Sequence, residues 1–254
     1  MIKCMLSIVI PTLNEEKYLP LLLKSIKKQG LKSREIIIAD AGSEDKTLGI
    51  AREYKCKIVP GGLPAKGRNQ GAKIAKGDLL LFLDADIILP ENFLSKALEE
   101  FNSRHLDIAA FRLFPVRENK FKHFLFNTFY NVPIMLLEKI LPHAATGILI
   151  KGSIFKKLNG YNEDIKLAED HDLSRRAKKI GKYGIIKSTR IFISERRFRK
   201  DGWIRTALRY LLCELYMVFI GPVKSDMFQY DFNHYSKDNG HSAFLNFILI
   251  SKKK

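Results

Sequence analysis

The stretch Leu79-Leu-Leu-Phe-Leu-Asp-Ala-Asp86 joins five apolar residues to two aspartates. A short apolar run that ends in polar residues is typical of a strand buried in a sheet. Mg²⁺ and Mn²⁺ prefer oxygen ligands, and Mg²⁺ usually completes its shell with substrate phosphates and water. The stretch therefore predicts a strand whose end carries two candidate metal ligands, Asp84 and Asp86. In the alternative interpretation, both aspartates only cap a helix that begins near Pro90.

On either side of this stretch, short β-rich segments alternate with longer helical ones. We expect strands at residues 5–10, 35–39, 57–59, 79–84 and 108–114, and helices at residues 15–28, 45–54, 65–75 and 91–101. This alternation predicts an α/β fold with a mainly parallel sheet and helices on both of its faces. In sheets of this kind, ligands bind beyond the carboxyl ends of the strands.

Polar residues gather at those strand ends. Thr12, Asn14 and Glu15 follow the first expected strand, and Asp40 follows the second. Each of them alone is explained as a helix cap. Together with the two aspartates after residue 83, they indicate a polar site along one edge of the sheet.

Two further segments point to the same edge. In residues 39–47, a glycine permits a tight turn and Ser43 or Asp45 can cap the next helix, which leaves Asp40 free to accept hydrogen bonds from a base or ribose. In residues 65–71, a basic helix start with two glycines would bring Arg68 towards phosphate or base. An ordinary turn and a solvated helix face are the alternative interpretations.

The amino-acid composition excludes some classes of protein and favours certain binding partners. The chain has 254 residues, of which 46% are hydrophobic, and this excludes wholesale disorder and a multi-span membrane protein. Lysine and arginine outnumber aspartate and glutamate by 44 to 27, so the net charge of +17 attracts polyanions. Three scattered cysteines argue against a disulfide framework and favour a reducing compartment. Since the N-terminal apolar run is too short for a signal peptide, we expect a cytoplasmic location.

In their order along the chain, these pieces resemble the inverting family 2 glycosyltransferases of the GT-A fold. The resemblance covers about residues 5 to 190. The matching elements are Pro11-Thr-Leu-Asn-Glu15, Asp40-Ala-Gly-Ser-Glu-Asp-Lys-Thr47, Gly67-Arg-Asn-Gln-Gly71, Phe82-Leu-Asp-Ala-Asp86, Gly160-Tyr-Asn-Glu163 and Ala168-Glu-Asp170. The Gln-x-x-Arg-Trp element of processive members is absent, which favours transfer of one sugar per acceptor.

The resemblance implies that the protein transfers a sugar from a nucleotide-diphosphate sugar to a hydroxyl or phosphate of an acceptor. We expect UDP as the first candidate for the nucleotide and GDP as the second. It implies Asp84 and Asp86 as ligands of Mg²⁺ or Mn²⁺, and Asp170, beside Glu169, as the general base. The donor-binding set that it implies is Pro11, Thr12, Asn14, Glu15, Asp40, Gly67, Arg68, Asp84, Ala85, Arg196 and Arg197. For the last two residues, an exposed basic loop stays open as the alternative. We expect Asp172 to be structural.

The strand–helix rhythm stops near residue 200, and we expect a catalytic domain over residues 1–200 and a helical appendage over residues 201–254. In the appendage, one helical face would carry Trp203, Ile204, Ala207, Leu208, Leu211, Leu212, Leu215 and Phe219, and the other Arg205, Thr206, Arg209 and Cys213. Such a helix either lies in an anionic lipid headgroup layer or packs on the catalytic domain. The apolar residues 121–141 and 244–250 add to an expectation of peripheral membrane attachment and of a lipid-linked acceptor such as a polyprenyl phosphate.

Two other functions remain as alternatives. A sugar nucleotidyltransferase also uses an α/β sheet and a metal, but its glycine-rich, arginine-bearing loop after the first strand is replaced here by Pro11-Thr-Leu-Asn-Glu15. A nucleic-acid-binding protein would suit the positive charge and the aromatic residues of the 196–203 segment. Because no RRM, KH, zinc-finger or recognition-helix pattern is present, we expect no nucleic-acid partner.

Overall fold

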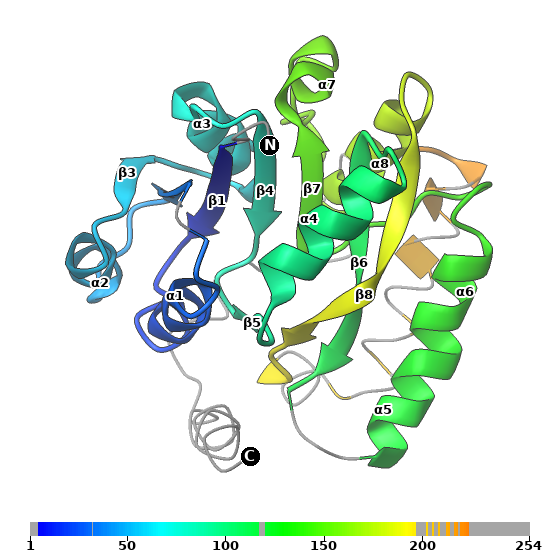
Figure 1. Ribbon diagram of the computed structural model, residues 1–254, viewed down its shortest axis with the longest axis horizontal. Coiled ribbons are helices and arrows are strands. Elements are labelled where there is room, and N and C mark those ends of the chain that lie inside the picture. Colours follow the sequence, from blue (N-terminus) through cyan, green and yellow to red (C-terminus); the bar gives the residue numbers. More distant parts are fainter. Residues whose placement is uncertain are drawn as a thin grey trace.

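The computed structural model describes residues 5–31, 33–116 and 120–196, together with isolated residues between 202 and 223. Its strands are β1 Leu6–Thr12, β2 Arg34–Asp40, β3 Lys57–Pro60, β4 Leu79–Leu83, β5 Ile87–Ile88, β6 Ile108–Pro115, β7 Gly147–Lys151 and β8 Tyr183–Ile193. Its helices are α1 Leu19–Lys27, α2 Thr47–Glu53, α3 Pro64–Ile74, α4 Phe93–Ser103, α5 Lys120–Phe126, the π-helix η1 Asn127–Asn131, α6 Val132–Leu136, α7 Gly152–Lys157 and α8 Glu169–Lys178. Figure 1 shows their arrangement.

Within the described residues the strands form one sheet in the order β3-β2-β1-β4-β7-β6-β8-β5. The first four are parallel, as predicted, whereas β7 is antiparallel to both β4 and β6. All the predicted strands and helices are confirmed, with small shifts at their ends. The largest shift is at α1, which begins at Leu19 because Asn14 has a φ of +54° and turns the chain first.

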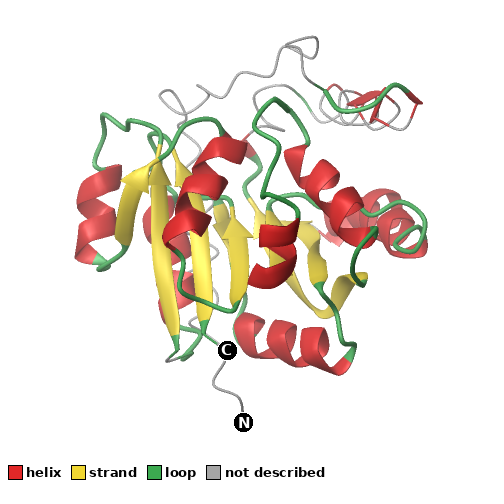
Figure 2. Cartoon of the chain, turned by 90° about the horizontal axis from the view of Figure 1, so that it is seen from above, coloured by secondary structure: helices red, strands yellow, loops and turns green. Residues whose placement is uncertain are grey.

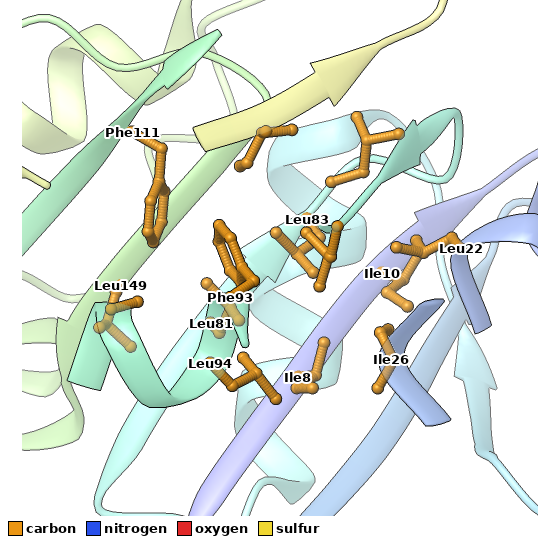
Figure 3. Close-up of a cluster of buried hydrophobic side chains, with 14 of the residues drawn as sticks. Ile8, Ile10, Leu22, Ile26, Leu81, Leu83, Phe93, Leu94, Phe111 and Leu149 are labelled. Carbon is orange, nitrogen blue, oxygen red and sulfur yellow. The ribbon is translucent and has the colours of Figure 1, made fainter. Parts of the chain in front are cut away.

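Each face of the sheet has its own core, because successive strand side chains point to opposite faces. Figure 2 shows the helices on both sides of the strands. On the face covered by α1 and α4, Ile8, Ile10, Leu81 and Leu83 pack with Phe93, as Figure 3 shows. On the other face, Val9, Leu80 and Phe82 pack against residues of α3, α7 and α8. Burial on both faces explains the near-continuous apolar runs of β1 and β4.

The sheet curls so that two distant parts of the chain meet. Only Asp84, Ala85 and Asp86 separate β4 from β5, yet β5 pairs with β8. The backbone N–H of Ser194 then donates to the carbonyl oxygen of Asp86 at 3.2 Å. The residues that follow β8 are therefore delivered to the two aspartates at the end of β4.

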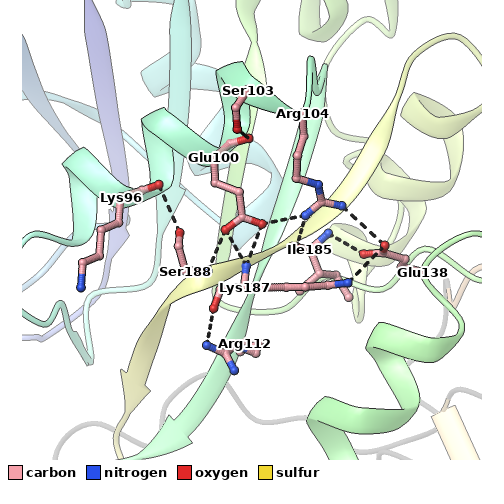
Figure 4. A network of polar contacts seen from close by, with 9 residues as sticks. All are labelled: Lys96, Glu100, Ser103, Arg104, Arg112, Glu138, Ile185, Lys187 and Ser188. Carbon is pink, nitrogen blue, oxygen red and sulfur yellow. Dashed lines mark hydrogen bonds and ion pairs between the residues drawn. The ribbon is translucent and has the colours of Figure 1, made fainter.

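A polar network holds α4 and the end of the 120–140 segment on β8 (Figure 4). The register of β8 against β6 shifts after Phe111, and Glu100 of α4 accepts hydrogen bonds from the freed N–H groups of Lys187 and Ser188 at 2.7–3.0 Å. Glu138 accepts the N–H of Ile185 at 3.0 Å. The Glu100 bonds satisfy backbone groups that the β-bulge leaves without a ladder partner.

Part of the described 202–223 segment packs on the domain. Cys213, Met217 and Val223 are buried with Leu167, so the side of this segment that carries Cys213 faces the domain. Leu208, Leu212 and Phe219 of the predicted apolar face are exposed. Trp203, Arg197 and residues 244–250 lie outside the described residues, and the domain boundary near residue 200 stays a prediction. Among the helices described, none has both the length and the apolar character needed to cross a bilayer.

Candidate active site

The loops after β1 and β2 are joined by Asp40. Its carboxylate accepts four hydrogen bonds, from the hydroxyls of Thr12 at 2.9 Å and Ser43 at 2.6 Å, and from the N–H groups of Gly42 at 3.0 Å and Ser43 at 2.8 Å. A carboxylate offers about four acceptor positions. The sequence had led us to expect a free Asp40 carboxylate, but in the structure its acceptor positions are occupied by its own loop. A nucleobase would have to displace one of these donors.

Asn14 and Glu15 tie the same two loops together through their backbone. The N–H of Asn14 donates to the Ser43 hydroxyl at 2.8 Å, and the Asn14 side-chain oxygen accepts the N–H of Glu44 at 2.9 Å. The N–H of Glu15 donates to the hydroxyl of Thr47 at 2.8 Å. The left-handed conformation of Asn14, which asparagine tolerates well, makes this exchange possible.

The glycines of α3 let the helix approach the sheet. A Cβ at Gly67 would lie 3.2 Å from the Pro11 Cβ, and one at Gly71 would lie 2.3 Å from Val9. Gly67 and Pro11, both predicted to bind the donor, thus contact each other across the helix–sheet interface. This close approach places α3, and with it the buried side chain of Arg68, against the sheet.

Arg68 gathers the carboxylates that the sequence had singled out. Its guanidinium lies 2.7 Å from Asp84 and 3.6 Å from Asp170, and it also pairs with Glu169. The ring of Tyr161 lies 5.4 Å from the guanidinium carbon, a cation–π distance. The structure therefore brings the first aspartate of Asp-Ala-Asp into one cluster with the predicted base.

Asp170 is held in a specific orientation within this cluster. The Tyr161 hydroxyl donates to its Oδ1 at 3.0 Å, and Asn69 fixes the Tyr161 backbone through hydrogen bonds of 2.8 and 2.9 Å. Burial, followed by the charges of Glu169 and Asp84, raises the pKa of Asp170 to about 7, although Arg68 opposes the shift. A carboxylate with a pKa near neutrality is suited to general-base catalysis.

Sequence reasoning recognised Gly160-Tyr161 as a motif but assigned no role to Tyr161 or Asn69. The asparagine within Gly67-Arg-Asn-Gln-Gly71 was the available signal. Asp172, in contrast, lies outside the cluster, because its carboxylate accepts from the guanidinium of Arg176 at 2.7 Å. This contact agrees with the structural role expected for Asp172.

A second arginine cluster forms around Arg196. Its guanidinium makes a bidentate pair with Glu15 at 2.9 and 3.2 Å, and its Nε lies 3.0 Å from Asp86. The Tyr18 ring lies 4.8 Å from the guanidinium carbon. Burial raises the pKa of Glu15 to about 7; Arg196 opposes this shift and Asp86 adds to it. The structure thus brings together Glu15, Asp86 and Arg196, three residues that the sequence had assigned to the donor or metal site without predicting their contacts.

The Asp84-Ala85-Asp86 triplet offers carboxylates with the right chemistry for a hard cation. The side chains of Asp84 and Asp86 are 32% and 22% exposed, so both remain accessible to solvent. Ala85 is buried in the core, so only its backbone could reach a donor. No group of three or more His, Cys, Asp or Glu side chains that could hold a metal occurs in the described parts of the chain. The two aspartates fit Mg²⁺ or Mn²⁺ that also binds phosphate.

Two curated proteins illustrate the sequence similarity of this chain to known proteins. TarS, the poly(ribitol-phosphate) beta-N-acetylglucosaminyltransferase of Staphylococcus aureus, is 27% identical over 182 residues, which cover 67% of this chain and 32% of TarS. GgaB, a minor teichoic acid biosynthesis protein of Bacillus subtilis, is 30% identical over 215 residues, which cover 77% of this chain and 23% of GgaB. The chain thus spans about a third or less of the length of these relatives.

Solved structures confirm the GT-A fold. TarS 1–349 in complex with UDP-GlcNAc has a TM-score of 0.61 at 24% identity, and the match covers 75% of this chain and 58% of that one. The mannosyltransferase PcManGT of Pyrobaculum calidifontis, in complex with GDP-Man and Mn²⁺, has a TM-score of 0.62 at 19% identity, over 86% of this chain and 71% of that one. The model of glycosyl transferase family 2 matches residues 7–157, and the chain therefore belongs to this family.

Proposed function

We propose that the chain transfers a sugar from a nucleoside diphosphate sugar to an acceptor, with inversion at the anomeric carbon. The observation that carries this proposal is the contact of Arg68 with both Asp84 and Asp170. One guanidinium links the strand end where a donor diphosphate would bind to a buried carboxylate that can take a proton.

In this proposal Asp170 is the general base. It accepts the proton of the acceptor hydroxyl while the hydroxyl oxygen attacks the anomeric carbon and the bond to the diphosphate breaks. Tyr161 and Arg68 hold the carboxylate in place, and their contacts favour its ionised form. A single displacement inverts the configuration and needs no covalent sugar–enzyme intermediate. Glu169 pairs with Arg68 and keeps that guanidinium beside Asp170.

Asp86, with Asp84 beside it, would hold Mg²⁺ or Mn²⁺ together with the donor diphosphate. The ion would offset the negative charge that develops on the leaving diphosphate. Asp86 would have to exchange its contact with Arg196 for this ion. After leaving Asp86, Arg196 would still be held at the edge of the donor site by its contact with Glu15. From there its guanidinium would be able to pair with phosphate oxygens of the donor.

We infer UDP as the first donor nucleotide and GDP as the second. TarS 1–349 was solved with UDP-GlcNAc, and PcManGT with GDP-Man and Mn²⁺. For the acceptor, the net charge of +17 favours a polyanion, and the TarS name includes poly(ribitol-phosphate). A polyol phosphate hydroxyl is thus the first acceptor to test, and a polyprenyl or other lipid-linked acceptor is the second. The scattered cysteines support a cytoplasmic location.

A thermal-shift screen with UDP, GDP and their sugar conjugates, with and without Mn²⁺, tests donor binding, because a ligand of the folded state raises the apparent melting temperature. We expect a nucleotide sugar with Mn²⁺ to give the largest shift. Product analysis tests the reaction: released nucleoside diphosphate supports sugar transfer. Released pyrophosphate would instead identify a sugar nucleotidyltransferase and overturn the proposal.

A further inference from the structure

The segment α5–η1–α6 and the turn after it, residues 120–140, is apolar on two sides. Its inner side packs on the domain through Phe126 and Tyr130, which contact one core, and Ile134, which contacts the other. These residues are spaced by four, as one side of a helix requires. Packing on the domain therefore accounts for these apolar residues, but not for the exposed ones in the same segment.

The outer side carries six large apolar side chains that are exposed. They are Phe121 (69% exposed), Phe124 (63%), Phe129 (75%), Leu136 (76%), Leu137 (42%) and Ile140 (78%). Single exposed apolar residues need no explanation, but six of them on one short rod do. A helix that is apolar all round is normally buried. We call these six side chains the outer face.

The outer face is fixed in place by contacts on the inner side. The Asn131 side chain is fully buried, and it accepts from the N–H of Leu113 and donates to the Leu113 carbonyl at 2.9 and 2.8 Å. His123 contacts the Pro115 carbonyl at 2.9 Å, and Glu138 accepts the N–H of Ile185, as Figure 4 shows. The rod runs along the right-hand side of Figure 1, at the margin of the fold. Its exposure is therefore built into the fold.

Positive charge flanks the outer face at both ends. Lys120 begins the segment and Lys139 lies near its end, and both are exposed. The acidic residue of the segment, Glu138, is turned inwards to Arg104 and Lys187. The ammonium group of Lys178 at the end of α8 donates to the Lys139 carbonyl and adds to this basic rim. Two copies meeting through this face would bring like charges together, whereas an anionic surface complements the lysines.

We propose that the outer face docks in the headgroup layer of an anionic membrane. Aromatic and aliphatic side chains enter the boundary between headgroups and acyl chains, and the lysines bind the lipid phosphates. The interaction uses none of the residues that we assign to sugar transfer. It does bring α8, the helix that carries Asp170, close to the bilayer, because Lys178 at the end of α8 donates to the carbonyl of Lys139.

Vesicle co-sedimentation of the full chain tests this proposal. We expect binding to phosphatidylcholine vesicles that contain phosphatidylglycerol, and weaker binding to phosphatidylcholine alone. In a triple variant, Phe121→Ser, Phe129→Ser and Ile140→Ser, partitioning should fall about 100-fold, since each change removes an exposed apolar anchor. The matched control is Leu63→Ser with Ile74→Ser, which removes exposed apolar side chains from α3 and its start, and should bind as the wild type does.

Nucleotide binding and the melting temperature of each variant show whether it is folded. If the protein does not transfer sugar, the vesicle result still tests the membrane proposal, because vesicle binding does not depend on catalysis. Equal binding of the wild type and the triple variant would overturn the proposal. So would a wild type that binds neither kind of vesicle. If sedimentation velocity shows self-association that the triple variant abolishes, without vesicle binding, the outer face contacts a second copy and the proposal is wrong.

Discussion

The two arginine clusters of the site share their chemistry and differ in how they are held. Arg68 and Arg196 each pair with carboxylates and lie over a tyrosine ring. Arg68 comes from the middle of α3, packed on the sheet by two glycines, and its side chain is 3% exposed. Arg196 follows the last strand, and its side chain is 11% exposed.

The difference divides the Asp-Ala-Asp motif into two parts. Asp84 contacts Arg68, which also contacts the proposed base Asp170. We therefore expect the position of Asp84 to change little when the donor binds. Asp86 contacts Arg196, the more exposed of the two arginines, and we expect a metal ion to replace this contact. We therefore expect changes around Arg68 to affect the chemical step and folding, and changes around Arg196 to affect metal and donor binding.

The largest effect is expected for Asp170→Asn, on the Arg68 side. The variant keeps the size of the side chain but cannot accept a proton, so kcat should fall about 10²–10⁴-fold while donor affinity changes little. Steady-state kinetics and calorimetry measure the two quantities. Asp172→Asn, outside the cluster, is the control and should cost less, and so should Glu169→Gln. Near-normal turnover of Asp170→Asn beside an inactive control would mean that the base is misassigned.

The next prediction is that replacing Arg68 lowers the free energy of unfolding more than replacing Arg196 does. Removing one member of a buried ion pair costs about 3–5 kcal/mol because the partner charge is left uncompensated. Arg68→Gln, which strands carboxylates in the interior, should show a loss of this size in urea unfolding. Arg196→Gln should lose about 1–3 kcal/mol, as for groups left without a hydrogen-bond partner. Equal losses would contradict the division of the site into a fixed and an exchangeable cluster.

On the Arg196 side, Asp86→Ala should abolish the metal dependence of donor binding. Titration calorimetry of the nucleotide sugar with and without Mn²⁺ should give the same affinity in this variant, whereas the wild type binds more tightly with Mn²⁺. If the variant keeps the wild-type response to Mn²⁺, the metal binds elsewhere in the site.

A further prediction concerns pH. The carboxyls of Asp170 and Glu15 have pKa values of about 7 in the fold, against ordinary values of 3.8 and 4.5. Between these values the folded chain keeps protons that the unfolded chain releases, so the stability of the metal-free protein should fall as the pH rises from about 4 to about 7. Urea midpoints across this range measure the fall, and Asp170→Asn should make it shallower. A stability that rises through this window would contradict the raised pKa values.

Much of this site could be predicted from the sequence. The strands with short apolar runs and the polar residues at their ends are local features, and they led to Asp84 and Asp86. Asp170 lies in the first turn of α8, and only the resemblance to family 2 glycosyltransferases singled it out as the base. Parallel neighbours in a sheet then bring such residues to one edge, as the Thr12–Asp40 hydrogen bond at 2.9 Å confirms.

What could not be predicted depends on contacts between distant parts of the chain. The pairing of β5 with β8 decides that Arg196 meets Asp86, and a two-residue strand gives no periodic signal. The occupation of Asp40 by its own loop, and the burial of Cys213 against Leu167, follow from backbone paths that apolar spacing does not encode. In the same way, only the packed structure shows that residues 120–140 expose one of their two apolar sides.

The exchange of Arg196 for a metal ion at Asp86 is tested most directly by titrating Mn²⁺ into the nucleotide-free protein and following free Mn²⁺ by electron paramagnetic resonance. Arg196→Gln removes the competing guanidinium and keeps both aspartates, so it should bind Mn²⁺ more tightly than the wild type, and adding Asp86→Ala to it should abolish the gain. If Arg196→Gln binds Mn²⁺ no more tightly than the wild type, Arg196 does not occupy the metal position, and the distinction between the two clusters is wrong.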